Sequence, residues 1–104
     1  ASWEGFALDG VVRQLGAERE ECFFWGTYGG AELDLLVVRG QRRIGFEFKR
    51  TLEPTLTRSM LVALEDLGLE RIDVLHAGER TFPIHPKVRA VALSRVLEDL
   101  KPIR

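Results

Sequence analysis

The turn at Gly40-Gln41 constrains this chain more than any other feature, because it separates two runs in which apolar residues alternate with charged ones. Such runs joined by two residues predict an antiparallel hairpin. Glycine at the first central position favours a type II′ turn, and residues whose numbers sum to 81 then lie opposite each other. In this register Asp34 faces Glu47, with Cβ atoms about 4.5 to 5.5 Å apart. Like charges at this distance are destabilising, so the pair requires a neutralising partner.

A divalent cation is the partner that these side chains favour. The register also sets Glu32 opposite Lys49, so that carboxylates and an ammonium group share one patch. Mg²⁺ in proteins is typically held by one or two carboxylates together with water and substrate phosphate. We therefore expect Asp34 and Glu47 to bind Mg²⁺ or Mn²⁺ in a hydrolytic site. The alternative is an amphipathic edge hairpin whose charged face lies in water, since most charged side chains are exposed.

Strand alternation predicts which side chains of the hairpin share a face. The expected faces are Leu33, Leu35 and Val37 on one side, and Glu32, Asp34, Leu36 and Val38 on the other. On the next strand Glu47 and Lys49 share a face, about 6.6 Å apart. Glu47 lies between Phe46 and Phe48, where a carboxylate is costly to bury unless it is paired, hydrogen-bonded or bound to metal.

The charge distribution favours a phosphodiester substrate, although the formal net charge is −1. Residues 1–38 contain seven acids and two bases, residues 39–58 two acids and six bases, and residues 59–104 seven of each. Basic residues clustered around an anionic pocket are typical of proteins that bind nucleic acid. The predicted nucleic-acid contacts are Arg39, Arg42, Arg43, Arg50 and Arg58. The alternative is a solvated turn that carries arginine for solubility.

The first helix is expected to bring a third carboxylate toward this hairpin. Ser2 is a typical N-cap and Gly16 a typical stop for a helix that ends at about Leu15. Its predicted buried stripe consists of Leu8, Val11, Val12 and Leu15. Glu4, four residues before Leu8, lies on the same face of the predicted helix, in its first turn. Glu4 either faces the hairpin or only complements the helix dipole at a solvated end.

The remaining segments predict one domain, residues 1–104, with an α/β fold of three layers in which helices flank a central mixed β-sheet. The expected order is α-β-β-β-α-β, then a further strand and a short C-terminal helix. The expected strands are 22–28, 31–39, 42–49, 72–76 and 88–93, and the later helices run from Thr55 or Thr57 to Leu67 and from a Ser94 cap to Leu100. A helix between the hairpin and the fourth strand supports parallel pairing. Pro83 and Pro86 bracket a turn or an edge segment.

Other conspicuous residues are assigned to structure rather than to chemistry. Cys22 has no partner for an internal disulfide, and His76 and His85 lack the companion ligands of a zinc site. The chain has no apolar run of about 20 residues and no export leader, so we expect a cytoplasmic protein without a membrane partner. The aromatic group is expected to fill the core, with base stacking as the alternative, and consists of Phe23, Phe24, Trp25 and Tyr28.

This order of elements, with Glu4, Asp34 and the tripeptide Glu47-Phe48-Lys49, resembles the PD-(D/E)XK, or restriction-endonuclease-like, superfamily over nearly the whole chain. More narrowly, the chain looks like the domain of unknown function that ends many bacterial and archaeal AAA-type ATPases. The segments that carry this likeness are Trp3-Glu4, Phe24 to Asp34, and Phe46 to Lys49. The resemblance implies a C-terminal fragment of a longer ATPase, because these 104 residues contain no phosphate-binding loop motif.

The resemblance also implies roles for individual residues. Asp34 and Glu47 are expected to bind Mg²⁺ or Mn²⁺, Lys49 to orient or activate water and stabilise developing charge, and Glu4 to assist the metal or its water. The implied catalytic residues are thus Glu47, Lys49 and Glu4. The implied partners are nucleic acid, an N-terminal ATPase domain in the full-length protein and, as a further option, a second copy in a homodimer.

Two functions stay open at this stage, because a fold can persist after its site has decayed. The first, which we favour, is a nuclease-like domain that binds nucleic acid through a metal ion and hydrolyses phosphodiesters. The second is a catalytically inactive docking or oligomerisation module that regulates the attached ATPase.

Overall fold

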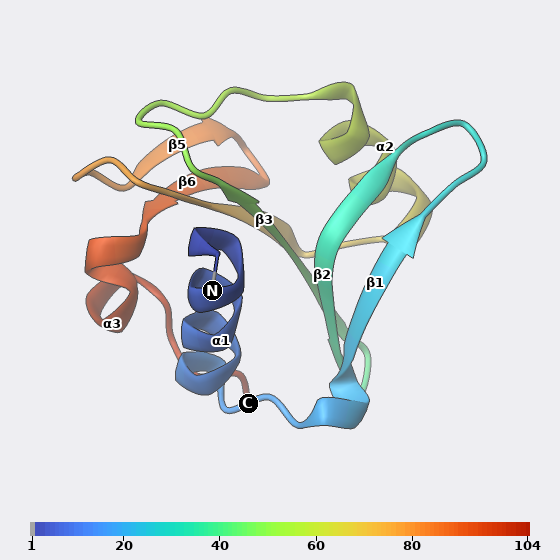
Figure 1. Ribbon diagram of the computed structural model, residues 1–104. Helices are drawn as coiled ribbons and strands as arrows, with labels where there is room; N and C mark the ends of the chain where they lie inside the picture. The colour runs from blue at the N-terminus through green and yellow to red at the C-terminus, as the bar shows by residue number, and fades with distance from the viewer. Residues whose placement is uncertain (1) are drawn as a thin grey trace.

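The computed structural model describes residues 2–104 and shows helices on both faces of a single β-sheet (Figure 1). In chain order the elements are α1 (Trp3–Leu15), the 3₁₀ turn η1 (Arg19–Glu21), β1 (Cys22–Gly26), β2 (Glu32–Arg39), β3 (Arg42–Lys49), α2 (Arg58–Leu67), β4 (Arg71–His76), β5 (Phe82–His85), β6 (Val88–Ala92), the 3₁₀ turn η2 (Leu93–Arg95) and α3 (Val96–Asp99). The predicted α/β class and order are confirmed. The segment around Pro83, which was expected to be a turn or an edge segment, is the strand β5 at the sheet edge.

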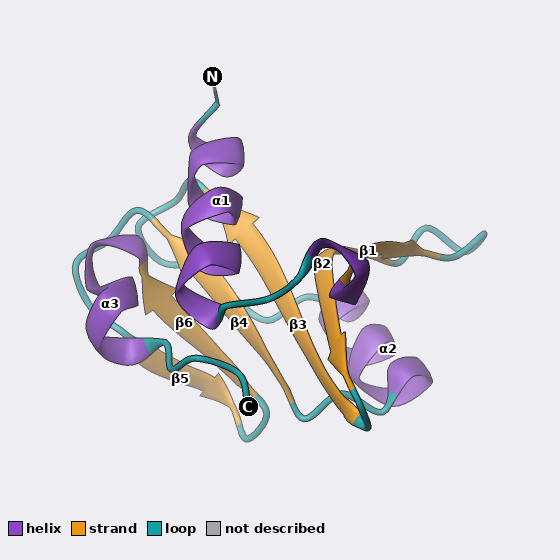
Figure 2. Ribbon diagram, turned by 90° about the horizontal axis from the view of Figure 1, so that it is seen from below, coloured by secondary structure: helices purple, strands orange, loops and turns teal. Residues whose placement is uncertain are grey.

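The sheet is mixed, with strand order β1-β2-β3-β4-β6-β5. The hairpin pairs β1–β2, β2–β3 and β5–β6 are antiparallel, whereas β3–β4 and β4–β6 are parallel. The crossover through α2 produces the parallel pairing of β3 with β4 that the sequence predicted. Figure 2 shows α1 and α3 on one face of the sheet and α2 on the other.

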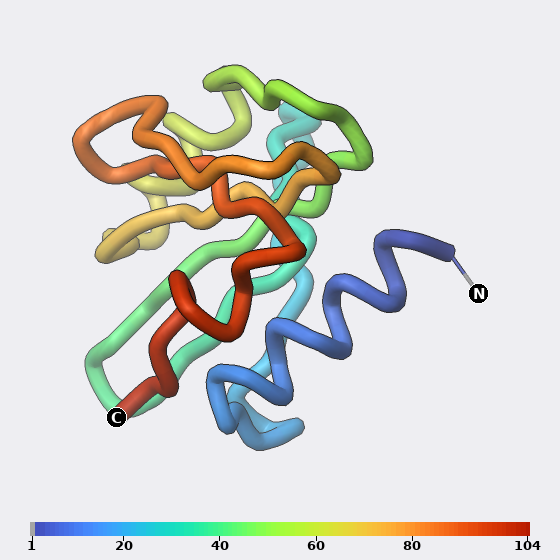
Figure 3. The backbone as a smooth tube through the Cα atoms, turned by 90° about the vertical axis from the view of Figure 1, so that its left-hand side faces the viewer, coloured from blue at the N-terminus to red at the C-terminus, as the bar shows by residue number. Residues whose placement is uncertain are grey.

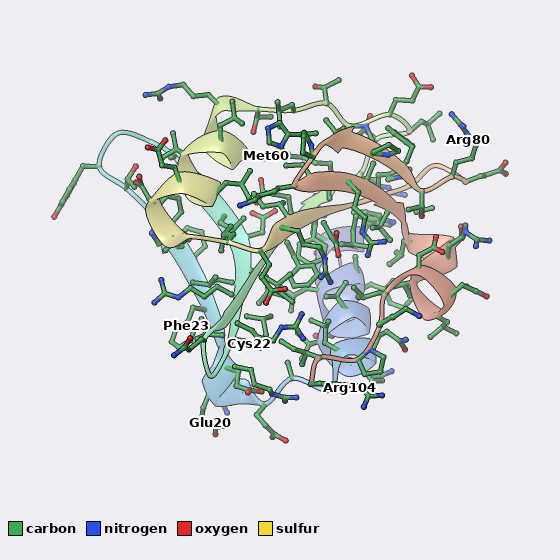
Figure 4. All side chains as sticks on the ribbon, turned by 180° about the vertical axis from the view of Figure 1, so that it is seen from behind. Glu20, Cys22, Phe23, Met60, Arg80 and Arg104 are labelled. Atoms are coloured by element: carbon green, nitrogen blue, oxygen red, sulfur yellow. The ribbon has the colours of Figure 1, made fainter. Side chains whose placement is uncertain are left out.

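Two apolar clusters hold these layers together, one on each face of the sheet. On the α1 face, Phe46 and Phe48 pack with Val11 and Leu15. On the α2 face, Met60 packs with residues of β2, β4 and β6. In Figure 4 the side chain of Met60 lies between α2 and the sheet. Because β3 pairs with β2 on one side and with β4 on the other, and packs Ile44, Phe46 and Phe48 into the core on the α1 face, it is a rigid support for side chains near its ends.

The helix ends follow the sequence signals in two cases out of three. The Ser2 hydroxyl accepts a hydrogen bond from the main-chain N–H of Gly5 at 3.0 Å, and α1 ends at Gly16. Thr57 caps α2 in the same way. The C-terminal helix is shorter than predicted, because the chain after β6 first forms η2 and Ser94 caps nothing. Figure 3 shows the C-terminal segment beside α1, where the N–H of Ile103 bonds the Leu15 carbonyl.

The prediction that the aromatic group fills the core is wrong for three of its four members. Phe23 and Phe24 are 49% and 67% exposed, Tyr28 is fully exposed, and only Trp25 packs against a core cluster. The reason is topological, since β1 is an edge strand and its hairpin with β2 projects past the helices (Figure 1). Figure 4 shows Phe23 at the outer edge of the sheet.

Candidate functional site

The predicted register of the β2–β3 hairpin is confirmed. Gly40, the first central residue of the turn, has a φ of 59°, as a type II′ turn requires. In the described part of the chain only glycines have a positive φ, so the φ of Gln41 is negative, which also fits this turn type. Backbone pairs run from the turn to Leu35 and Phe46. They end one step before Asp34 and Glu47, and Figure 1 shows the two strands spreading apart beyond this point. The predicted pairing of Glu32 with Lys49 therefore does not form.

Beyond the last backbone pair, hydrogen bonds between side-chain carboxylates and the main chain connect β2 and β3. The main-chain N–H of Asp34 donates to Glu47 Oε2 at 2.7 Å, and the main-chain N–H of Phe48 donates to Asp34 Oδ2 at 2.9 Å. Each acid thus binds the backbone of the opposite strand. This arrangement fixes both side chains between β2 and β3 and leaves Asp34 Oδ1 and Glu47 Oε1 without a main-chain donor.

A β-bulge on β2 determines where Asp34 points. Leu36 pairs with Phe23 of β1, but Leu33 pairs with Trp25, so two residues of β2 lie opposite one residue of β1. As a result, Leu33 packs in the cluster on the α2 face, and the expectation that it shares a face with Leu35 is wrong. The extra residue turns Asp34 toward α1, which the simple alternation of the sequence did not predict.

Glu47 is a buried acid without a close cation. Its side chain is 7% exposed, and its nearest cation is the ammonium of Lys49, 3.9 Å from Oε1 on a half-exposed side chain. Burial raises the pKa of Glu47 to about 7, and the charge of Asp34 adds to this effect. The hydrogen bond from the Asp34 backbone and the charge of Lys49 act in the opposite direction but do not cancel it. The pair therefore carries charge that the chain itself leaves largely uncompensated.

Glu4 lies near this region in the first turn of α1, which is the first of the two alternatives that the sequence left open. An open pocket of about 400 Å³ lies between α1 and the hairpin, and its wall includes Glu4, Asp34 and Lys49. Glu47 does not line this pocket and lies behind Asp34, between the strands. Glu4 itself is exposed, so its carboxylate is available to a bound molecule. Glu4, Asp34 and Lys49 therefore line one pocket. The fourth predicted site residue, Glu47, lies outside it and accepts a hydrogen bond from the Asp34 N–H.

The donor set fits a hard divalent cation with an incomplete protein shell. Asp34 and Glu47 offer carboxylate oxygens, the ligand type that Mg²⁺ and Mn²⁺ prefer. Within residues 2–104 no group of three or more acidic, histidine or cysteine side chains lies close enough together to enclose a metal ion. An ion held here would take its remaining ligands from water and substrate, which is the usual arrangement for Mg²⁺.

The five predicted arginine contacts fall into two groups. Three lie at the turn end of the hairpin, away from the carboxylates, and bind other parts of the chain: Arg39 contacts Glu21, Gly16 and Ile103, Arg42 contacts Glu70, and Arg43 contacts Leu67. The other two, Arg50 and Arg58, are exposed and make no ion pair in the described part of the chain. Arg50 directly follows Lys49, and a pocket lined by Lys49 and Thr57 brings the start of α2 to the same end of the sheet.

A second buried acid, Asp73 on β4, was not singled out from the sequence. It is fully buried and binds Arg71 at 3.1 Å and Arg89 at 2.8 Å. Arg89 also donates to the carbonyl of Asp99, which ties β4 and β6 to α3. The signal in the sequence was the position of Asp73 among the apolar residues of β4. That Arg89 is its partner follows only from the pairing of β4 with β6.

The fold and the site together define a three-layer α/β domain with a carboxylate pair between two splayed strands. Residues 1–96 match the model of the domain family DUF4143, described as a domain of unknown function, and the chain belongs to this family. No helix in residues 2–104 is long and apolar enough to cross a membrane.

Two curated relatives are similar to this chain along most of its length. They are the uncharacterised proteins Rv2008c of Mycobacterium tuberculosis and Mb2031c of Mycobacterium bovis, each 42% identical over 97 residues. The match covers 93% of this chain but 22% of each relative, so the chain spans about a fifth of their length. No solved structure matches the chain.

Proposed function

We propose that this chain is a nuclease-like domain of the PD-(D/E)XK kind, which binds nucleic acid through a divalent metal ion and hydrolyses phosphodiester bonds. The observation that carries the proposal is the pair of hydrogen bonds across the end of the β2–β3 ladder, in which the Asp34 N–H donates to Glu47 Oε2 and the Phe48 N–H donates to Asp34 Oδ2. It holds two carboxylates together, with Lys49 beside them and Glu4 across the pocket. Purely structural buried acids are normally paired closely with cations, whereas Glu47 has only the Lys49 ammonium at 3.9 Å.

The residues take separate roles in this proposal. Asp34 and Glu47 would hold Mg²⁺ or Mn²⁺, which when bound polarises the phosphoryl oxygen and lowers the pKa of water. Lys49, whose ammonium lies 3.9 Å from Glu47 Oε1, is near enough to orient water and to offset charge that develops on the phosphate. Glu4 accepts a proton or a hydrogen bond from that water. The backbone N–H groups of Asp34 and Phe48 keep the two carboxylates in place.

Phosphate contacts near the site are assigned to Arg50 and Arg58. Both are exposed and close in sequence to Lys49 or to the start of α2. Arg39, Arg42 and Arg43 bind acids and carbonyl groups at the far end of the hairpin. We propose that these three stabilise the hairpin and contribute less to nucleic-acid binding.

The domain is proposed to act within a longer protein. The chain spans about a fifth of the length of its mycobacterial relatives, which is consistent with one domain among others. We propose an N-terminal ATPase domain of the AAA type as the neighbour that controls access of nucleic acid to this site.

A hydrolysis assay tests the proposal. Labelled single-stranded and duplex oligonucleotides are incubated with the chain in Mn²⁺, in Mg²⁺ and in EDTA. We expect metal-dependent cleavage in the wild type, loss of cleavage in Asp34→Asn and in Lys49→Met, and no change in Glu70→Gln, whose acid lies in the surface pair with Arg42. Metal-independent cleavage, or equal cleavage by Asp34→Asn, contradicts the proposal.

A second candidate function is docking or self-assembly through β1. This edge strand exposes Phe23 and Phe24, contains no charged residue or proline that would block a further strand, and has one free edge. Sedimentation velocity distinguishes this function, because a dimer through β1 would dissociate in Phe24→Lys while Asp34→Asn would leave it intact. Dimerisation without metal binding would favour the docking function.

A further inference from the structure

A second pocket opens beside the proposed metal site, at the carboxyl end of β4. It has a volume of about 430 Å³, and its polar and aromatic lining consists of Glu53, His76, Glu79, Arg80 and Phe82. Three parallel strands, β3, β4 and β6, end at this edge of the sheet. Ligands of open α/β sheets bind outside the carboxyl ends of parallel strands, so the position itself is typical of a binding site.

The pocket is close to Lys49 because the strands that carry it are neighbours. Lys49 and His76 are the last paired residues of β3 and β4, and paired residues of adjacent strands lie about 4.8 Å apart. Glu53 lines this pocket and also the pocket of Lys49, so the two surfaces are continuous. A molecule bound at Lys49 can therefore extend into this pocket.

Two loops preform the pocket. The main-chain N–H of Ala77 donates to the carbonyl of Thr51 at 2.8 Å, which ties the loop after β4 to the loop after β3. Gly78 makes this approach feasible, since a Cβ there would lie 2.6 Å from the carbonyl oxygen of Leu52. Backbone contacts between the two loops therefore hold part of the pocket wall in place.

The groups that face the pocket suit a flat, polar ring. The ring of Phe82 and the guanidinium of Arg80, 5.8 Å from the ring centroid, both provide surfaces on which bases stack. Arg80 is exposed and free to move outward as a base enters. The Glu53 carboxylate accepts hydrogen bonds from an exocyclic amino group. His76 adds its Nε2–H group, which makes no hydrogen bond of standard geometry in residues 2–104.

His76 is fully buried in the wall of this pocket. Its Nδ1 accepts a hydrogen bond from the N–H of Gly78 at 3.0 Å, which places the ring proton on Nε2. Nε2 has no hydrogen-bond partner of standard geometry in residues 2–104. The carbonyls of Arg80 and Leu52 only partly oppose the lowering of the His76 pKa by burial. A buried donor without an acceptor is unfavourable, and an acceptor atom on a bound ring would satisfy it.

We propose that this second pocket binds the base of a nucleotide next to the phosphate held by Asp34 and Glu47, so that the substrate is single-stranded or locally unstacked nucleic acid. The inference rests on the proposed function and adds the substrate class to it. A base inside a duplex remains stacked on its neighbours and cannot enter a pocket unless it leaves the helix. Duplex of the same sequence is therefore expected to bind more weakly than the single strand.

The test measures binding of a fluorescein-labelled (dA)₁₀ strand by fluorescence anisotropy in Mg²⁺, with adenine offering an amino group to Glu53. Every protein compared carries Lys49→Met, which is expected to prevent cleavage of the probe. Phe82→Ala is expected to weaken binding roughly 5- to 150-fold, the factor that corresponds to loss of one stacked base. Arg80→Gln, at an exposed position that does not carry the fold, is expected to weaken it several-fold. Phe24→Ala removes a more exposed aromatic ring from β1, at the opposite edge of the sheet, and is expected to leave binding within twofold.

A parallel calorimetric titration with Mg²⁺ separates this inference from the proposed function. Phe82→Ala and Arg80→Gln should bind Mg²⁺ as the wild type does. If they also bind (dA)₁₀ as tightly as the wild type, or if duplex binds as well as single strand, the base pocket is wrong and the metal site stands. If the wild type binds no Mg²⁺, the proposed function fails, and the inference fails with it.

Discussion

Asp73 and Glu47 are buried acids on neighbouring strands of one sheet, and they are neutralised in opposite ways. Asp73 has two arginines within 3.1 Å, one from its own strand and one from β6. Glu47 has only a half-exposed lysine at 3.9 Å and a second carboxylate in contact with it. The chain thus supplies its own counter-charge where an acid holds the fold together. At the β2–β3 splay it supplies only the distant charge of Lys49, and this difference is the reason to look for a cation from outside.

Removal of the paired acid should have the largest effect on stability. Asp73→Ala leaves Arg71 and Arg89 without their shared carboxylate, and breaking a buried ion pair typically costs about 3 to 5 kcal/mol. Urea unfolding should show this loss. Glu70→Ala, which breaks the exposed pair with Arg42, should cost less than about 1 kcal/mol. Equal losses in the two variants would mean that Asp73 is not the structural acid that its contacts indicate.

Removal of the unpaired acid should stabilise the metal-free domain. The pKa of Glu47 in the folded state is about 7, above the unfolded value of 4.5, so the carboxyl group favours folding while it is protonated. That contribution is lost as pH rises from about 4.5 to about 7, because the unfolded state then releases its proton first. At pH 8 in EDTA, Glu47→Gln should therefore be more stable than the wild type by roughly 3 kcal/mol.

Urea unfolding at pH 4.5 and at pH 8 measures this effect as a difference between the two proteins. The gain of Glu47→Gln should be small at the lower pH and largest at the higher one, since only the wild type must place a charge between the strands. Glu70→Gln serves as the control for removal of a surface carboxylate. A Glu47→Gln variant that is less stable than the wild type at pH 8 would show that the chain does neutralise this acid.

The two groups of arginines should differ in nucleic-acid binding. Arg50→Ala is expected to lower the slope of log affinity against log salt by about 1, as loss of one phosphate contact does. Arg42→Ala should leave the slope unchanged, because its guanidinium binds Glu70 at the far end of the hairpin. A fluorescence anisotropy series at several salt concentrations checks both values. A larger change in Arg42→Ala than in Arg50→Ala would move the binding surface to the turn.

Lys49→Met should have the smallest effect on stability, below about 1 kcal/mol, since the ammonium is half-exposed and weakly coupled to Glu47. Loss of its charge should raise the pKa of Glu47 further, because Lys49 is one of the groups that lower it. The midpoint of the pH dependence of unfolding should therefore move upward. A midpoint that moves downward would show that Lys49 does not act on Glu47 through its charge.

The sequence was informative about the site because a two-residue turn sets a register for many residues at once. Gly40 determined which residues of β2 and β3 pair, and this held as far as Leu35 and Phe46. The helix caps at Ser2 and Gly16 were readable for a similar reason, since each depends on one residue and its immediate neighbours.

Features that depend on long-range packing could not be predicted from the sequence. The bulge on β2 that turns Asp34 toward α1 depends on β1, whose pairing has no local signal. The exposure of Phe24 depends on the position of β1 at the sheet edge, and composition alone favoured the core. Asp73 is another example, because its partner Arg89 lies sixteen residues away and meets it only through parallel pairing of β4 with β6.

Calorimetric titration of the metal-free chain with Mg²⁺, repeated with Mn²⁺, tests most directly whether Asp34 and Glu47 bind a cation. We expect saturable binding of one ion to the wild type and to the Glu70→Gln control, and loss of that binding in Asp34→Asn and Glu47→Gln, each shown to be folded by its unfolding curve. Absence of binding to the wild type, or undiminished binding to Asp34→Asn and Glu47→Gln, would contradict a metal site between β2 and β3.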